Sequence, residues 1–482
     1  MLSTECMKEI FQYVKKNNES LYPSLLVNHH WCNNAVPLLW ACLFENLNFD
    51  NIYKITSVYM LLLEEHEKSH LKKLIITNSY SQKSILKLIS NRPLFNYSMM
   101  LEEFSLKNLD IIVYSWIAVI WPDENFEESR KQIMQIKEQM ILFLFKLFIK
   151  STNLKFLRID SDKILNHVPN LQQTIGQFLN ISKLEIGYAA QQMSINSINF
   201  LEKISTTCNK IDNLIIKVPA FENNPEIKNS IISIINAQKQ LREFSFRGVD
   251  SWIEEIIKAA LLSQANSLIS IKLECVNISE SSLNSLAKCT NLENFVILNY
   301  SGLVKLRNNF EFKNLKKLYI RRPLMNIKIP NLIELTLDVL TQEVMLYIIE
   351  NCSNITHLTL NNYRPVPHDQ IFKMSIQKLH ITHLTIKFLY SKSIISESSI
   401  LSKEFLPPSL RYLVIHCELI TIFLDSLLDE CCYTKLKKLI INLMKDYNSI
   451  INSQFDNIAV KYLCHFKYLL NLTRFQIFIS VD

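Results

Sequence analysis

The chain has 482 residues, 48% of them hydrophobic, and carries a formal net charge of +7. This length exceeds that of an ordinary single domain, unless the core grows lengthwise through repeated units. The positive excess is spread along the chain without a block of about five or six like charges, so it gives no reason to expect a nucleic-acid partner. The 4 glycines stand far apart, and the sequence therefore lacks the phosphate-binding loops of Walker and dinucleotide-binding proteins.

Targeting signals are also missing from the sequence. The N-terminus shows no basic start followed by an apolar stretch, so we expect no signal peptide. The longest apolar run, Ile111–Trp121, is too short to span a bilayer. The 11 cysteines include no C-x-x-C pair and are expected to be thiols of a reducing compartment. We therefore predict a cytoplasmic or nuclear protein, neither secreted nor transmembrane, with no membrane partner.

Residues 1–45 predict a small helical domain. Apolar residues recur at helical spacing just after the N-terminus. A second helix is expected over Ser20–Trp31 and a third over Asn34–Trp40, with Pro23 and Pro37 each in a first turn. Three such short helices bury little surface by themselves, so they need either a partner or the adjoining domain.

From residue 71 onward one short pattern, Leu-x-x-Leu-x-Ile, returns along the chain, with Ile or Phe allowed at its apolar places. About fifteen copies lie mostly about 23–30 residues apart, which is the period of a leucine-rich repeat. The clearest copies are Leu71–Ile76, Leu154–Ile159, Leu315–Ile320, Leu332–Leu337, Leu410–Ile415 and Leu436–Ile441, and looser ones begin at Leu101, Ile181, Ile211, Leu241, Leu268, Leu292, Ile355, Ile381 and Leu472. A repeat array of this kind is normally a surface that holds a partner, so the pattern favours a binding protein.

Each copy predicts a strand whose first, fourth and sixth residues face the core, while the residues between them point to the opposite face. Segments such as Ser251–Ser263 and Gln342–Glu350 have helical spacing and are expected to return along the convex side. The predicted fold class is α/β, a curved solenoid with a parallel concave sheet and convex helices, preceded by the N-terminal helices. We place the domains at residues 1–45 (helical), 46–150 (linker helices and first degenerate repeats with a helical insertion) and 151–482 (solenoid).

Two details refine this picture. The interval between the copies at Leu101 and Leu154 is about twice the usual period and contains an expected helix near residues 124–150, which we interpret as an insertion or a degenerate repeat. Cys208, Cys289 and Cys352 each stand three residues before a copy, and Cys432 stands four before Leu436. That place is expected at the end of the convex helix, where a small apolar side chain turns into the core.

The N-terminal segment resembles an F-box. The family pattern is Leu-Pro-x-Glu before an apolar helix, then a second helix leading to Val-x-x-x-Trp, and a closing Leu-Trp pair. The chain reads L-S-T-E-C-M-K-E-I-F, then L-L-V-N-H-H-W, then L-L-W, and it departs from the pattern at Ser3, where the family most often has proline. An F-box followed by leucine-rich repeats is a known pairing.

This resemblance implies a substrate-recognition subunit of a Skp–cullin–F-box ubiquitin ligase. The F-box would bind a Skp-family adaptor and, through it, a cullin–RING ligase, while the repeats hold a protein substrate. The chain would catalyse nothing, need no cofactor, and act by raising the local concentration of the substrate. The residues that the resemblance assigns to adaptor binding are Leu2, Glu5, Ile10, Leu25, Leu26, Val27, Trp31, Leu39 and Trp40. The alternative is a leucine-rich-repeat scaffold whose N-terminal helices only cap the solenoid.

Residues between the core places of the C-terminal copies form the candidate substrate face. Tyrosine and arginine on a preformed surface are favourable anchors, and the excess of basic side chains indicates an acidic or phosphorylated protein substrate. Ordinary solvated strand residues are the other interpretation. The candidates are Lys317, Tyr319, Arg321, His357, His383, Lys387, Tyr412, His416, Lys438 and Arg474.

One short motif points to a different chemistry. Residues 66–70 spell H-E-K-S-H, the H-E-x-x-H spacing of zinc proteases. The motif stands where a helix is expected to end and the strand Leu71–Ile76 to begin, so the two histidines need not share a helical turn. No third ligand is identifiable. We therefore predict neither a metal site nor catalytic residues.

Overall fold

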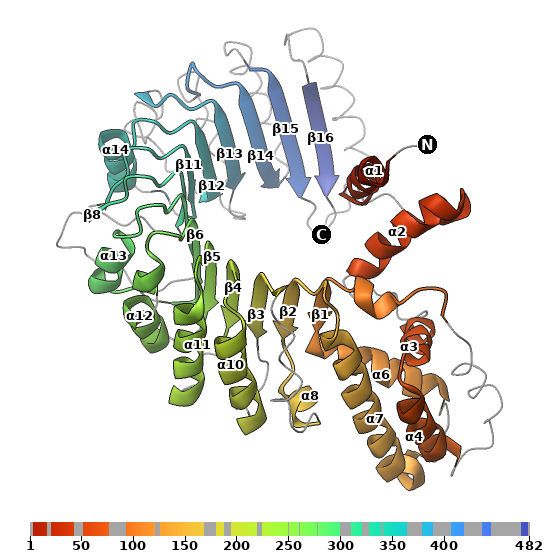
Figure 1. The fold of residues 1–482 in the computed structure, drawn as a ribbon. Coiled ribbons are helices and arrows are strands. Elements are labelled where there is room, and N and C mark those ends of the chain that lie inside the picture. Colours follow the sequence, from red (N-terminus) through yellow and green to blue (C-terminus); the bar gives the residue numbers. More distant parts are fainter. Residues whose placement is uncertain are drawn as a thin grey trace. The chain divides into compact units, whose positions relative to one another are not determined.

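The structure is a computed structural model of residues 1–482, drawn in Figure 1. It describes residues 3–16, 21–42, 52–76, 93–120, 126–167, 180–187, 194–218, 224–248, 250–259, 261–276, 278–298, 310–320, 327–338, 340, 342–363, 378–388, 406–418, 436–444 and 474–480. The chain divides into two compact units, Met1–Gln264 and Ala265–Asp482.

The first unit begins with three helical segments, α1 (Thr4–Lys16), the 3-10 helix η1 (Tyr22–Leu26) and α2 (His29–Ala41). They close around a small core of Met7, Phe11, Leu21 and Ala35. The side chain of Asn28 caps α2 by accepting a hydrogen bond from the backbone N–H of Trp31 at 2.9 Å.

The position of Pro37 differs from the prediction. Pro23 does lie in the first turn of η1, but Pro37 lies inside α2, because the expected second and third helices meet in one continuous helix that begins at His29. A proline at this place removes one backbone hydrogen bond of the helix.

The next part of the first unit is helical. It consists of α3 (Ile52–Leu61), α4 (Glu65–Ile76), the short η3 (Tyr97–Met100), α6 (Leu106–Ile120) and α7 (Phe126–Ile149). Helix α7 confirms the helix expected near residues 124–150. The predicted strand Leu71–Ile76 is wrong, since these residues form the second half of α4, where Leu71 and Ile75 are buried one turn apart. No helix among the described residues is long and apolar enough to cross a bilayer.

Five parallel strands follow one another in the sheet of the first unit: β1 (Glu103–Ser105), β2 (Phe156–Ile159), β3 (Lys183–Gly187), β4 (Asn213–Lys217) and β5 (Glu243–Arg247). The helices between them are α8 (Asp162–Asn166), α10 (Ile195–Thr207), α11 (Pro225–Ala237), α12 (Asp250–Ala259) and η5 (Leu261–Gln264). Helices α10 to α12 lie side by side along one face of the strands in Figure 1.

The second unit continues the pattern. Its parallel sheet pairs β6 (Ser270–Glu274), β7 (Asn294–Leu298), β9 (Lys317–Ile320), β11 (Glu334–Leu337), β12 (His357–Tyr363), β13 (His383–Phe388), β14 (Tyr412–Glu418), β15 (Lys438–Met444) and β16 (Arg474–Ser480) in that order. The other elements among the described residues of this unit are helices α13 (Glu280–Leu286) and α14 (Gln342–Asn351) and a separate two-stranded pair, β8 (Phe310–Glu311) and β10 (Ile327–Lys328).

Every predicted copy of the motif except Leu71–Ile76 coincides with a strand. The register is the expected one, with the first, fourth and sixth places buried, as at Leu315, Leu318 and Ile320. The third, fifth and seventh places lie on the other side of the sheet, which we call the open face. The α/β leucine-rich-repeat architecture is therefore confirmed.

Side-chain amides join successive repeats outside the strands. An asparagine just before the motif donates to a backbone carbonyl of the preceding repeat, as Asn314 does to Thr290 at 2.6 Å. The same bond recurs at Asn153, Asn180, Asn291, Asn331 and Asn354. Because each bond satisfies a carbonyl that a strand cannot reach, it fixes the spacing of neighbouring repeats.

Candidate interaction surfaces

The N-terminal helices leave several large apolar side chains in water. Ile10 and Tyr13, one turn apart on α1, are 42% and 71% exposed. On and just after η1, the exposed fractions are 66% for Tyr22, 89% for Leu26 and 54% for Val27. Large apolar side chains gathered on one small unit are typical of a surface that another protein covers. We call these five residues the N-terminal apolar surface.

The residues predicted for adaptor binding fall into two groups. Glu5, Ile10, Leu26 and Val27 are exposed. Leu25, Trp31 and Leu39 instead pack on the small helical core, with the rings of Trp31 and Phe11 5.4 Å apart. Leu2 lies outside the described residues. The sequence reasoning missed Tyr13 and Tyr22, although the position of Tyr13 three residues after Ile10 was a usable signal.

Trp40 connects the N-terminal helices to the rest of the first unit. Its ring lies 5.4 Å from that of Tyr59 on α3 and 4.1 Å from that of Tyr97 on η3. Next to it, the carbonyl oxygen of Ala41 accepts a hydrogen bond at 2.9 Å from the backbone N–H of Glu102, just before β1. These contacts show that α2 is fixed against the start of the repeats.

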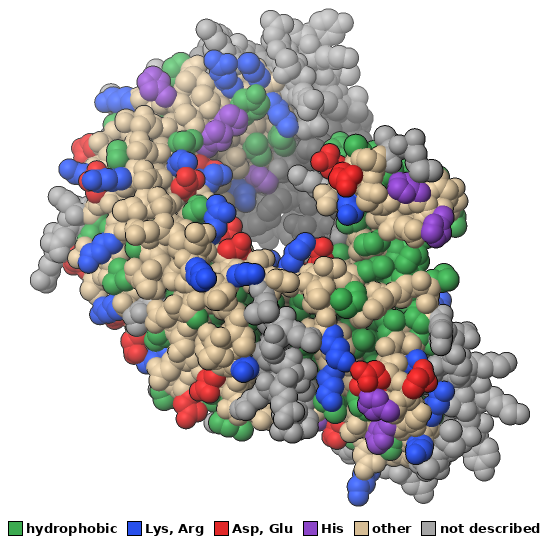
Figure 2. All heavy atoms as spheres, in the orientation of Figure 1, with side chains coloured by type: hydrophobic (Ala, Val, Ile, Leu, Met, Phe, Trp, Pro, Cys, Tyr) green, Lys and Arg blue, Asp and Glu red, His purple; other side chains and the backbone are tan. Residues whose placement is uncertain are grey.

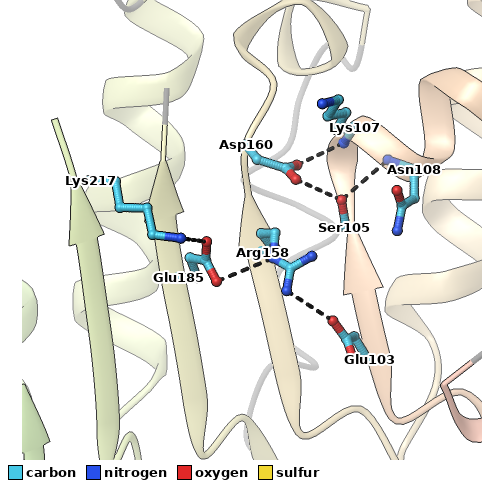
Figure 3. A network of polar contacts seen from close by, with 8 residues as sticks. All are labelled: Glu103, Ser105, Lys107, Asn108, Arg158, Asp160, Glu185 and Lys217. Atoms are coloured by element: carbon cyan, nitrogen blue, oxygen red, sulfur yellow. Dashed lines mark hydrogen bonds and ion pairs between the residues drawn. The ribbon is translucent and has the colours of Figure 1, made fainter. Parts of the chain in front are cut away.

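Charged side chains on the open face of the first unit pair with one another (Figure 3). Arg158 contacts Glu103 at 3.3 Å and Glu185 at 3.2 Å, and Lys217 contacts Glu185 at 2.8 Å. Burial alone would raise the pKa of Glu185, but the hydrogen bonds and charges of Lys217 and Arg158 outweigh it and lower this pKa. This chain of ion pairs links four neighbouring strands and leaves little net charge there.

Asp160 belongs to the same region and has a structural role. Its carboxylate accepts hydrogen bonds from the hydroxyl of Ser105 at 2.8 Å and from the backbone N–H of Lys107 at 2.7 Å, at the start of α6 (Figure 3). Burial raises the pKa of Asp160, and the two hydrogen bonds oppose that rise. The carboxylate thus fastens the beginning of α6 to the sheet.

In the second unit, the open face between β9 and β12 is also neutralised internally. Lys317 pairs with Glu334 at 2.7 Å. Tyr319 donates to Asp338 at 2.8 Å, and burial together with that carboxylate raises the pKa of the tyrosine to about 12. The side-chain amide of Asn361 donates hydrogen bonds to the Tyr319 hydroxyl and to the Asp338 carboxylate. The polar atoms of Lys317 and Tyr319 therefore have partners within the chain.

Beyond β11 the open face changes character. The rings of His357, His383 and Tyr412, which occupy the third place of successive copies of the motif, stack in a row. Their centroids are 3.9 Å and 4.2 Å apart, and their planes are within 12° and 5° of parallel. Lys438 continues this row on β15.

A second row of side chains lies at the seventh place of the same motif copies. Lys387 on β13 is in register with His416 on β14. Burial and the charge of Lys387 lower the pKa of His416, while burial and His357 lower that of His383. Arg474 begins β16 in register with Lys438, but the structure describes only its backbone, and Arg321 lies outside the described residues.

The H-E-x-x-H motif lies on helix α4, contrary to the expectation that a strand begins there. His66 is exposed and contacts Glu64 at 3.3 Å, while the ring of His70 lies 6.1 Å from that of Phe143. Glu67 accepts the backbone N–H of Glu64 at 3.0 Å, which makes it a cap of the helix. No group of three or more metal-ligating side chains occurs within the described ranges.

Comparisons with known proteins give distant likenesses. No protein-family model and no curated protein sequence matches the chain. Among solved structures, a chain of the yeast Rad7–Elc1 complex is similar at 12% identity and a TM-score of 0.29, over 75% of this chain and 93% of that one. An internalin (inlF) of Listeria monocytogenes is similar at 13% identity and a TM-score of 0.24, over 69% and 93% of the two chains. These values are too low to assign a function.

Proposed function

We propose that the chain is the substrate-recognition subunit of a Skp–cullin–F-box ubiquitin ligase. In this proposal the N-terminal helices bind a Skp-family adaptor, the open face of the repeats holds a protein substrate, and the chain itself carries out no catalysis. The supporting observation is the N-terminal apolar surface, which includes Ile10, Leu26 and Val27, three of the residues that the F-box resemblance assigns to adaptor binding.

The energetics favour a covered surface. An apolar side chain that moves from water into an interface gains about 25 cal/mol for each Å² buried, so three large side chains contribute several kcal/mol in total. Leu26 and Tyr13 contribute nothing of this kind while they remain in water. The bound adaptor would then bring the substrate near a charged ubiquitin-conjugating enzyme, which is an effect of local concentration.

A second candidate function is a leucine-rich-repeat scaffold without a role in ubiquitination. The contacts of Trp40 and Ala41 support it, because they join α2 to α3, to η3 and to Glu102, the residue just before the first strand of the repeats. A cap accounts for these inward contacts. It gives no reason for Leu26, in the same helical segment, to be 89% exposed.

The test uses a substitution that spares the core. Replacing Trp31 or Trp40 would disturb the packing of the helices, so loss of binding could come from misfolding. Leu26→Asp changes a side chain in water, and Leu94→Asp is its matched control, since Leu94 is also 89% exposed but lies outside the helical segment. Each variant of residues 1–482 is co-expressed with a Skp-family adaptor and examined by size-exclusion chromatography.

We expect a stoichiometric complex for the wild-type chain and for Leu94→Asp, and at least about tenfold weaker binding for Leu26→Asp, as is usual for a side chain central to an interface. Equal thermal unfolding of the three chains shows that the fold is unchanged. A wild-type chain that stays monodisperse and ignores the adaptor would rule out the ligase proposal and leave the scaffold.

A further inference from the structure

The strands β12 to β15 carry an unusual charge distribution on their open face. Among the side chains that the structure describes there, none is a carboxylate, whereas basic side chains occur on every strand. Only one acidic residue, Glu418 at the last place of β14, occurs in the sequences of β12 to β16. We call the set His357, His383, Lys387, Tyr412, His416 and Lys438 the basic face; in Figure 2, purple histidine side chains and blue lysine or arginine side chains lie over this part of the second unit.

This distribution contrasts with two other parts of the open face. In the first unit Arg158 and Lys217 are neutralised by glutamates, and in the second unit Lys317 is neutralised by Glu334. Like charges brought together without counter-charges repel one another and reduce stability. Among the described side chains of β12 to β15 there is no carboxylate to neutralise Lys387 or Lys438, and a basic surface of this kind is complementary to an acidic ligand.

The hydrogen bonds beneath the stacked rings determine where the protons lie. The hydroxyl group of Thr382 donates its single hydrogen bond to the carbonyl oxygen of Thr356 at 3.2 Å. Its oxygen therefore accepts from Nδ1 of His383, 2.9 Å away. Neutral His383 then carries its proton on Nδ1, and a second proton goes to Nε2, the nitrogen farther from the backbone. Thr356 lies in the same way 2.8 Å from Nδ1 of His357.

We propose that the basic face binds an extended, carboxylate-rich segment of a protein partner, and that its histidines take up protons when the segment binds. Identifying that partner as a ubiquitination substrate rests on the proposed function; the binding itself does not. Neighbouring strands lie about 4.8 Å apart, so an extended segment of about five residues crosses the four strands β12 to β15.

Carboxylates fit this surface better than a phosphate group does. The basic side chains stand one or two to a strand, in two rows separated by the neutral Thr385 and Val414. A single phosphate is best held by several donors that converge on one point. Donors spread along rows instead match charges spread along a chain.

The direction of the pH dependence follows from the neighbours of His383. It is flanked by His357 on β12, by Lys387 on its own strand, and by Tyr412 and His416 on β14, and none of these offers a negative charge. Burial and His357 lower the pKa of His383 in the free chain, so it is neutral at pH 7. A bound carboxylate favours the charged imidazolium and raises this pKa. The affinity therefore increases as the pH falls through the range between the bound and free pKa values.

The experiment measures fluorescence anisotropy of labelled peptides with the full chain. The probes are an alternating Asp–Glu peptide of about ten residues, a Ser–Gln peptide of equal length, the same neutral peptide with one phosphoserine, and a single-stranded oligonucleotide of similar extended length. We expect the Asp–Glu peptide to bind most tightly, and about tenfold more tightly at about pH 5.5 than at about pH 7.5, while its carboxylates stay ionised.

Three variants make the test specific. Lys438→Gln should weaken peptide binding at both pH values, whereas Lys317→Gln, at the same place of an earlier repeat but neutralised by Glu334, should leave it unchanged. The double variant His357→Gln, His383→Gln should remove most of the pH dependence. Equal loss in both lysine variants, or tighter binding of the phosphopeptide or the oligonucleotide, would overturn the proposal.

Failure here is distinguishable from failure of the proposed function, because adaptor binding is measured separately. A chain that forms the adaptor complex but ignores every acidic peptide would overturn the inference about the basic face alone. A chain that binds the Asp–Glu peptide but no adaptor would support this inference and reject the ligase.

Discussion

At the scale of single residues, two buried glutamines illustrate how side chains outside the repeat motif hold it together. Gln238 accepts the backbone N–H of Ile211 at 2.8 Å and donates to the carbonyl oxygen of Cys208 at 2.9 Å. Gln264 makes the equivalent pair of bonds with Leu241 and with Gln238 in the next repeat. These repeats lack the asparagine that precedes other copies, and the glutamines take over its linking role.

We expect Gln238→Met to be strongly destabilising. Methionine fills a similar volume but leaves a buried N–H and a buried carbonyl without partners, which costs about 2–4 kcal/mol. The measurement is amide hydrogen exchange at Ile211 together with the urea midpoint of the full chain. Asn314→Ala, which removes one exposed bond, should cost only about 1 kcal/mol, and unchanged exchange at Ile211 would contradict the assigned role of Gln238.

The cysteines at the helix ends provide a second prediction. The expectation that Cys208, Cys289 and Cys352 turn into the core is confirmed, since each is at most 5% exposed, while Cys432 lies outside the described residues. Burial raises the pKa of the Cys208 and Cys289 thiols to about 11 and that of the Cys352 thiol to about 12. A hydrogen bond from Thr207 lowers the pKa of Cys208 but does not outweigh the effect of burial. Since the thiolate is the reactive form, these three should resist alkylation at about pH 8.

Mass spectrometry after iodoacetamide treatment checks this at each site. The exposed Cys6 and Cys275 should be labelled in the native chain and act as internal controls. All five thiols should react once the chain is unfolded. Labelling of Cys289 as fast as Cys275 under native conditions would show that the ends of the convex helices open.

At the scale of elements, one hexapeptide shows why a motif alone does not determine structure. LKKLII occurs twice, at Leu71–Ile76 and at Leu436–Ile441. The first copy completes helix α4, and the second begins just before strand β15. The pattern satisfies both geometries, because its apolar places also fall one helical turn apart. The residues before Leu71 decide the outcome, since they start a capped helix that continues through the motif.

Glu67 is therefore expected to stabilise α4 instead of acting as a catalytic base. Glu67→Ala removes its hydrogen bond to the backbone N–H of Glu64 and should cost about 1 kcal/mol of stability, which thermal unfolding measures. The purified chain should contain no stoichiometric zinc by elemental analysis. Chelator-sensitive proteolysis that disappears in Glu67→Ala, without a change in stability, would instead restore the zinc-protease hypothesis.

At the scale of the whole molecule, the sequence predicted the periodic features well and the contacts between repeats poorly. Strand positions and buried faces follow from a repeated spacing, which a single chain displays many times over. The stacking of His357 on His383 and the ion pairs of Arg158 depend on which residues of different repeats share a register, although these residues lie far apart in the sequence. The same holds for the residues assigned to adaptor binding. Helical spacing alone does not predict that Trp31 packs on the helical core while Leu26 is exposed.

The two proposed interaction surfaces should act independently. The N-terminal apolar surface belongs to the unit Met1–Gln264 and the basic face to the unit Ala265–Asp482, so they share no residue. Coupling between sites requires that one ligand bind two states of the other site differently. With each surface built on helices or strands of its own unit, we expect the adaptor to change the affinity for the Asp–Glu peptide by less than about twofold, or about 0.4 kcal/mol.

The check measures the affinity for the Asp–Glu peptide by fluorescence anisotropy, with and without saturating adaptor, in the wild-type chain and in two single variants. Leu26→Asp should weaken adaptor binding at least about tenfold and leave peptide affinity intact, while Lys438→Gln should weaken peptide binding and leave adaptor binding intact. A shift in peptide affinity of tenfold or more on adaptor binding, which corresponds to about 1.4 kcal/mol, would mean that the units change conformation together. Substrate capture would then be controlled by the ligase, instead of being a fixed property of the repeats.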